Sequence, residues 1–209
     1  MKKILFILAI VTFGLTSCDD YLDINVDPNS PSVEDVTPEM IFPGVEMNLA
    51  SSYGNFLRIV GGYYAQHYAQ NFGTSNYLDY SQFKMSAVRS SSTYVQLFTR
   101  TLNNIKTIQE KTEATEEWGT YLAATTLRAF TYQVLVDAYG EVPYTEAFDL
   151  GNLSPKYDEG LAVYKGILDE LDFALSKAVP SDVVCTNLLF GSATAGDWIK
   201  FAKALKLKL

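Results

Sequence analysis

The sequence predicts an all-α fold built from antiparallel helix pairs. Apolar residues recur at intervals of three and four over long stretches, and helix-ending residues follow several of these stretches. No segment has the alternating pattern of a half-buried strand. With 48% hydrophobic and 19% charged residues, the chain has enough apolar material to form a globular core.

Residues 1–17 are predicted to be a lipoprotein signal peptide. A basic start precedes an apolar run over 4–15, which as a helix would measure about 18 Å. That is too short for the ~30 Å hydrocarbon core of a membrane, but it suits the apolar region of a secretory signal. The run ends in LTSC, which resembles a bacterial lipobox, where a cysteine thiolate takes the lipid. We therefore expect Cys18 to carry the membrane anchor; the alternative is an ordinary signal peptide that happens to contain a cysteine.

Residues 18–43 are predicted to form an extended, proline-rich tether. Each proline fixes its own φ and biases the preceding residue away from the helical region. Thr37 followed by Pro38 also indicates a helix N-terminus, so a short helix is expected near 39–42. The helical body is expected to cover 44–209.

Within the body, helical spacing predicts five segments: 45–64, 91–112, 118–139, 159–178 and 197 onward. The segment 118–139 has apolar residues on two faces, so we expect it to be buried on two sides. Gly140 is its expected C-terminal cap, and Asp158 is the expected N-terminal cap of the next helix. A helix buried in this way suits a solenoid-like stack, and because the tetratricopeptide consensus is not matched, any such repeat is degenerate.

The last predicted helix stops at Leu209 inside an amphipathic pattern, without a glycine, a proline or a polar tail. Helices ordinarily end at such a signal. This pattern predicts that the 209 residues are the N-terminal part of a longer protein.

The composition excludes several classes of function. Asp and Glu number 24 against 16 Lys and Arg, for a net charge of −8, which argues against general nucleic-acid binding. One histidine and two cysteines leave almost no material for a metal site or a disulfide framework. We expect no metal, no cofactor and no catalytic residue.

Residues 63–80 combine tyrosines and a phenylalanine with amide and hydroxyl side chains, and they include no lysine or arginine. Aromatic faces pack against the C–H surfaces of sugars, while amides and hydroxyls bind sugar hydroxyls. Up to Tyr68 the helical spacing persists, so the first part is interpreted as core. Beyond it a ligand-binding loop is predicted, although these side chains could also serve packing alone. The predicted ligand-binding residues are Asn71, Phe72, Asn76, Tyr77 and Tyr80.

Three groups of segments carry a family resemblance: LRAFTYQ leading into DAYGEVPYTEA at 127–147, PKYD at 155–158, and GDWIKFA at 196–202. In this order, and after a lipobox, they resemble the SusD/RagB family of Bacteroidetes outer-membrane lipoproteins, in its SusD-like branch. The resemblance implies a non-catalytic, cell-surface lipoprotein of tetratricopeptide-like helix pairs. Such a protein binds glycan or another nutrient and delivers it to a SusC-like TonB-dependent outer-membrane transporter.

The sequence is also compatible with two other functions. A lipid-anchored glycoside hydrolase would need a pair of carboxylates, and Asp137, Glu141 and Glu146 lie around one predicted turn. Acidic residues are common at helix ends and in turns, so this clustering has a simpler explanation. The third possibility is a scaffold whose aromatic stretch contacts only protein.

Overall fold

The computed structural model describes residue 32 and residues 34–84 and 87–209. The predicted signal peptide, Cys18 and most of the predicted tether lie outside the described residues. The chain divides into two units between Val36 and Thr37, and the second unit contains every described helix. These elements are α3 (Pro38–Ser52), η1 (Tyr53–Leu57), α4 (Arg58–Tyr64), α5 (Leu78–Ser81), α6 (Ala87–Gln96), η2 (Leu97–Leu102), α7 (Asn103–Ala114), α8 (Trp118–Tyr139), α9 (Gly160–Lys177) and α10 (Gly196–Lys208).

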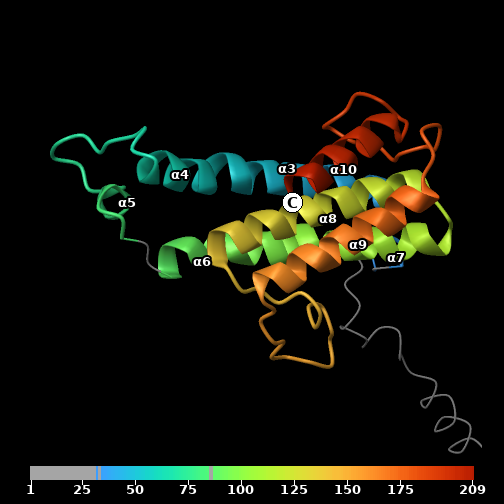
Figure 1. The fold of residues 1–209 in the computed structure, drawn as a ribbon, viewed down its shortest axis with the longest axis horizontal. Helices are drawn as coiled ribbons and strands as arrows, with labels where there is room; N and C mark the ends of the chain where they lie inside the picture. The colour runs from blue at the N-terminus through green and yellow to red at the C-terminus, as the bar shows by residue number, and fades with distance from the viewer. Residues whose placement is uncertain (1–31, 33, 85–86) are drawn as a thin grey trace, which may run out of the picture. The chain divides into compact units, whose positions relative to one another are not determined.

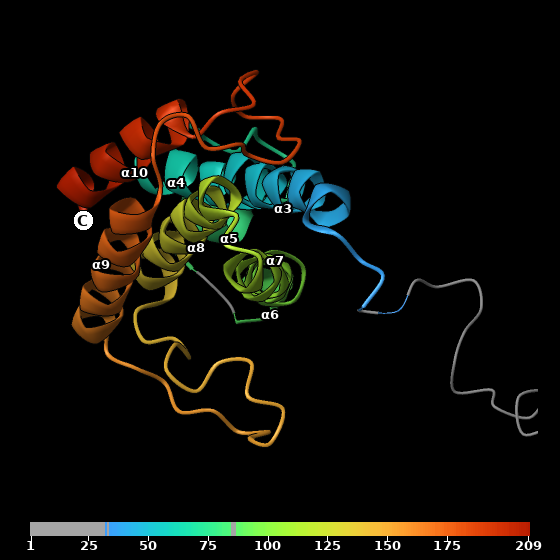
Figure 2. The same ribbon diagram turned by 90° about the vertical axis from the view of Figure 1, so that its right-hand side faces the viewer.

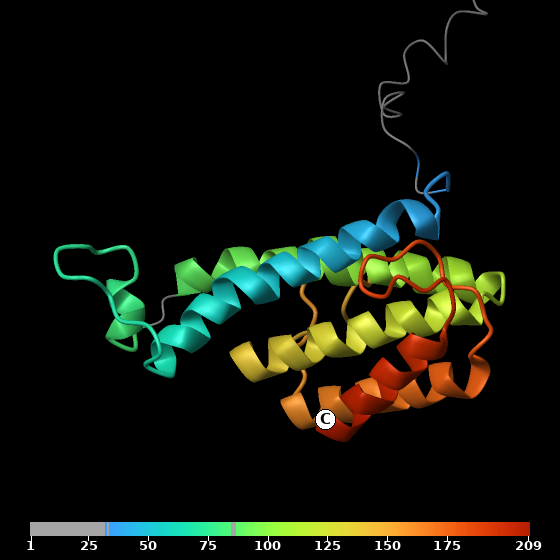
Figure 3. The same cartoon turned by 90° about the horizontal axis from the view of Figure 1, so that it is seen from above.

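Neighbouring helices of the second unit run in alternating directions (Figures 1 and 3). The continuous rod α3–η1–α4 is antiparallel to the rod α6–η2–α7, α8 turns back along α7, and α9 turns back along α8. Helix α10 packs against both α8 and α9. The described residues contain two isolated β-bridges and no strand. The predicted all-α architecture of antiparallel pairs is therefore confirmed.

Helix α8 is the centre of the core and lies among α3, α7, α9 and α10 (Figure 2). It begins and ends at the predicted residues, and Gly140 follows it with a φ of +81°. Burial on two sides is confirmed by side chains that are wholly inaccessible, namely Leu122, Ala123, Ala124, Ala129, Tyr132 and Leu135. Burial of each large apolar side chain stabilises the fold by about 1.5–3 kcal/mol. Helix α8 therefore contributes strongly to the packing of the helices around it.

The first helix of the body begins at Pro38 with Thr37 at its N-cap position, as the Thr37–Pro38 pair predicted, but it continues through Pro43 instead of stopping before the predicted boundary at 44. Proline in a helix interior costs ~3 kcal/mol because a hydrogen bond is lost. Phe42 and Val45 on either side are wholly buried, and Phe42 packs edge-on against Trp198 with ring centroids 5.7 Å apart. Burial of these two side chains offsets the cost, which local sequence rules did not anticipate.

The prediction that Asp158 caps α9 is wrong. The capping position of α9 is Glu159, and no side chain caps its N-terminus. The carboxylate of Asp158 instead accepts hydrogen bonds from the backbone N–H groups of Tyr144 and Thr145, at 3.1 and 2.8 Å. It fastens the loop between α8 and α9 rather than the helix.

None of the described helices combines the length and apolarity needed to cross a membrane.

Candidate functional site: a polar and aromatic hollow beside α5

A hollow of about 280 Å³ lies where η1, α5 and α6 meet. Its walls combine hydroxyls, amides and aromatic rings. The lining residues are Ser51, Ser52, Asn55, Phe56, Ile59, Tyr77, Tyr80, Ser92, Thr93 and Gln96. None of them has an ionisable carboxylate, ammonium, guanidinium or imidazole group.

The two amides of the hollow lie at π-helical segments. Asn55 lies within η1, and Gln96 directly precedes η2. A π-helical turn inserts extra backbone and rotates the following side chains, and such turns occur frequently at functional sites. The packing of the two rods brings one amide from each rod to the same hollow.

An aromatic cluster forms the end of the hollow near α5. Tyr80 is 3% exposed and packs edge-on against Phe56, with centroids 6.1 Å apart. Tyr77 stacks on Tyr80 at an interplanar angle of 21° and is itself 38% exposed. Tyr63 contacts both of these tyrosine rings. Tyr80 thus supports the cluster from within, whereas Tyr77 offers part of its ring to solvent.

The loop before α5 is held by the side chain of Gln70. Its amide oxygen accepts hydrogen bonds from the hydroxyl of Tyr63 and the backbone N–H of Tyr77, each at 3.2 Å. Its amide nitrogen donates to the hydroxyl of Thr74. Gln70 therefore links the end of α4 to the residue that begins the aromatic wall.

The structure brings two of the five predicted ligand-binding residues to the hollow. Tyr77 and Tyr80 line it, whereas Asn71 and Asn76 are exposed in the preceding loop and Phe72 is fully exposed beside Gly73. Sequence reasoning missed Asn55 and Gln96, because a polar residue in a helical pattern ordinarily indicates a solvated face. Within the described residues no group of three His, Cys, Asp or Glu could hold a metal ion.

The alternating antiparallel helices place the chain in the class of tetratricopeptide-like helical domains, and the uncharged, tyrosine-walled hollow is its candidate site. The chain belongs to a SusD-like family described as "Starch-binding associating with outer membrane", whose model matches residues 28–209. The resemblance seen in the sequence motifs is confirmed.

One solved structure, a chitin-binding protein, is similar with a TM-score of 0.69 and 22% identity. The match covers 82% of this chain and 38% of that chain, so this chain spans well under half of the relative's length. At this identity the likeness shows the fold alone. No curated protein matches the chain.

Proposed function

We propose that this protein is a non-catalytic, lipid-anchored receptor that binds glycan at the cell surface and delivers it to a SusC-like TonB-dependent outer-membrane transporter. The observation that carries the proposal is the hollow, which joins Tyr77 with Asn55 and Gln96 in an uncharged wall. The family description, with its starch binding and outer-membrane association, supports the same function.

The chemistry of the hollow suits a sugar ring. A partly exposed tyrosine face packs against the apolar C–H surface of a pyranose, and amides pair with vicinal hydroxyls because each has both donors and an acceptor. At about 280 Å³ the hollow is slightly smaller than typical sites for drug-sized ligands, which measure ~300–1,000 Å³. It fits a short stretch of a glycan chain better than a long one.

The carboxylates considered for a glycoside hydrolase have structural partners or face solvent. Asp137 accepts a hydrogen bond from the hydroxyl of Tyr164 at 2.5 Å, and Glu146 accepts one from the side-chain amide of Asn152 at 2.8 Å. Glu141 is exposed, and none of the three lines the hollow. This arrangement supports binding rather than hydrolysis.

The test is calorimetric titration with oligosaccharides of starch and chitin, extended to a glycan array. Tyr77→Ala is expected to weaken binding about tenfold or more, because loss of an aromatic face removes on the order of 1.5 kcal/mol or more. Asn55→Ala should weaken binding comparably. Tyr157→Ala, which removes an exposed tyrosine outside the hollow, is the matched control and should have no effect.

Absence of binding to every glycan on the array would contradict the proposal, and release of shortened products would favour a hydrolase. Delivery is tested by co-purification from outer membranes: a TonB-dependent transporter should be recovered with the protein. If the transporter is recovered but no glycan binds, the scaffold hypothesis would replace the receptor.

A further inference from the structure

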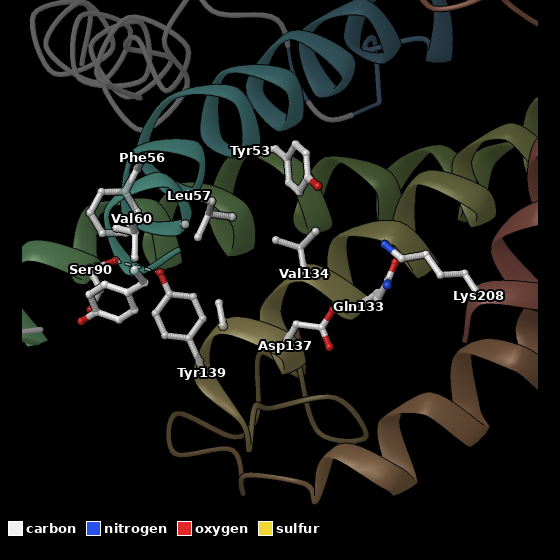
Figure 4. A pocket seen from close by; sticks show the side chains of 13 residues that line it. Tyr53, Phe56, Leu57, Val60, Ser90, Gln133, Val134, Asp137, Tyr139 and Lys208 are labelled. Carbon is white, nitrogen blue, oxygen red and sulfur yellow. Dashed lines mark hydrogen bonds between the residues drawn. The ribbon is translucent and has the colours of Figure 1, made fainter. Parts of the chain in front are cut away.

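A second, larger cavity of about 440 Å³ lies on the α8 side of η1 (Figure 4). Its upper wall in the view comes from η1 and α4, including Tyr53 and Leu57, and its lower wall from the last turns of α8. The ring of Phe56 lines both this cavity and the hollow described above. The volume lies within the range of small-molecule sites.

The floor of this cavity contains a buried amide without a full set of partners. Gln133 is 4% exposed, and its side-chain oxygen has no hydrogen-bond partner among the described residues. Leaving such a group unpaired costs ~1–3 kcal/mol, and most buried polar atoms in proteins are paired. A carbonyl oxygen is satisfied only by a donor, so an occupant that supplies an O–H or N–H group would complete the site.

The residues of the cavity walls indicate which other chemical features the occupant should have. Three tyrosines line the cavity, and two of them lie on opposite walls, Tyr53 on η1 and Tyr139 on α8. The hydroxyl of Tyr139 donates to the backbone oxygen of Ser90 at 3.1 Å, which fixes the position of its ring. Aromatic rings on two sides suit a compact ligand with an apolar face, and Tyr53 is half exposed at the opening.

Polar side chains of both charges lie at the rim. Asp137 on α8 is an acceptor, and Lys208 extends from the end of α10 toward the α8 side chains (Figure 4). Ligands with hydroxyl groups can use both, since a hydroxyl donates to a carboxylate and accepts from an ammonium. A purely apolar occupant would leave the buried Gln133 oxygen without a partner.

We propose that this cavity is a second carbohydrate-binding site, in which a pyranose lies between Tyr53 and Tyr139 and one of its hydroxyls donates to the side-chain oxygen of Gln133. This inference rests on the proposed function, because it takes the ligand class from it. The two sites lie on either side of Phe56 and are independent, so a short oligosaccharide occupies each separately.

The experiment is calorimetric titration of the full chain with a disaccharide or trisaccharide of the glycan that binds best on the array. The expected stoichiometry is two sugars per protein. Gln133→Leu, which keeps the side-chain size but removes the acceptor, should weaken one of the two sites about tenfold and leave the other unchanged. Tyr53→Ala, a change at a half-exposed position that spares the core, should act on the same site as Gln133→Leu.

The matched control is Asn55→Ala, which should weaken only the site in the hollow. A wild-type stoichiometry of one, abolished by Asn55→Ala and indifferent to Gln133→Leu and Tyr53→Ala, would overturn the second site while leaving the receptor function intact. If Gln133→Leu raises the melting temperature without any effect on sugar binding, the cavity is a packing surface for polypeptide and the inference fails. Only the absence of sugar binding at both sites would contradict the proposed function itself.

Discussion

Individual polar side chains, among them the buried Asp158, fix the long connection between α8 and α9. The carboxylate of Asp158 accepts from two backbone N–H groups and from the hydroxyl of Thr145. Nearby, the hydroxyl of Tyr144 donates to Glu170 at 2.6 Å, and Arg128 pairs with the same carboxylate at 2.8 Å. The ring of Tyr144 also lies so close to Gly166 that a Cβ there would come within 2.4 Å of it. These contacts hold the connection against α8 and α9.

Asp158 should make stability depend on pH in the acid range. Burial opposes ionisation of this carboxyl, but hydrogen bonds from Thr145 and Tyr144, with the Lys156 ammonium nearby, outweigh it and lower its pKa. Because the folded pKa lies below the unfolded value of about 3.9, the stabilisation is present above that pH and is lost as pH falls through the folded pKa. Asp158→Asn should lower the free energy of unfolding by about 1–3 kcal/mol at pH 7, and the difference from wild type should shrink below pH ~4.

Urea denaturation at a series of pH values measures this difference directly. Glu141→Gln, at an exposed carboxylate of the same connection, is the control and should follow the wild-type curve. A difference between Asp158→Asn and wild type that stays constant down to pH ~2 would contradict the assignment.

At the scale of elements, α3 organises the segment that leads from α9 to α10. Glu46 on α3 is buried, and its carboxylate accepts from the backbone N–H groups of Leu188 and Leu189 at 2.6 and 3.2 Å. Burial is the largest influence on this carboxyl and raises its pKa, while the two N–H donors act in the opposite direction. One side chain thus secures a connection more than 140 residues away in sequence, beyond the reach of any local pattern.

Glu46→Ala should therefore loosen the connection before α10. Two backbone donors lose their acceptor, and the expected cost is about 1–3 kcal/mol in the free energy of unfolding. Hydrogen exchange should show faster exchange at the Leu188 and Leu189 amides than in wild type. Glu39→Ala, at an exposed glutamate of the same helix, should leave both amides protected as before; equal exchange in the two variants would refute the role of Glu46.

At the scale of the whole molecule, the chain is acidic, with a net charge of −8. An acidic body is not attracted to an anionic lipid surface by its own charge. We therefore expect membrane attachment to depend on the predicted lipid at Cys18, since one cysteine that carries several acyl chains would anchor stably whereas a single chain binds only marginally.

Cys18→Ser should release the protein from the membrane fraction, because serine lacks the thiolate that takes the lipid. Fractionation of the expressing cells and mass spectrometry of the N-terminal peptide measure the outcome. Cys185→Ser is a matched control: this thiol is buried in the body, and its replacement should leave the protein in the membrane fraction. Membrane association that persists in Cys18→Ser, with an unmodified N-terminus, would show that the anchor was wrongly assigned.

The sequence alone predicted the long helices and the family resemblance, but not the short helix α5 or the two π-helical segments. Helix signals are local: the apolar spacing of Trp118–Tyr139 and the glycine after it predicted both ends of α8, since helical periodicity and a positive φ depend on the residues concerned. The motifs that carry the family resemblance are likewise contiguous. Because such patterns are local, the sequence indicated aromatic ligand-binding residues at Tyr77 and Tyr80 but not which residues lie across the hollow from them.

Only the tertiary structure decided where the binding surfaces lie. Asn55 and Gln96 are polar residues in helical patterns, and nothing in those patterns separates them from solvated positions. The packing of the two rods, each with a π-helical turn, brings them beside Tyr77. In the same way, only the arrangement of α8 and η1 around a shared cavity shows that the buried Gln133 oxygen is unpaired there. Local sequence determines which segments are helical and where they end, but a site between helices depends on which of their faces meet.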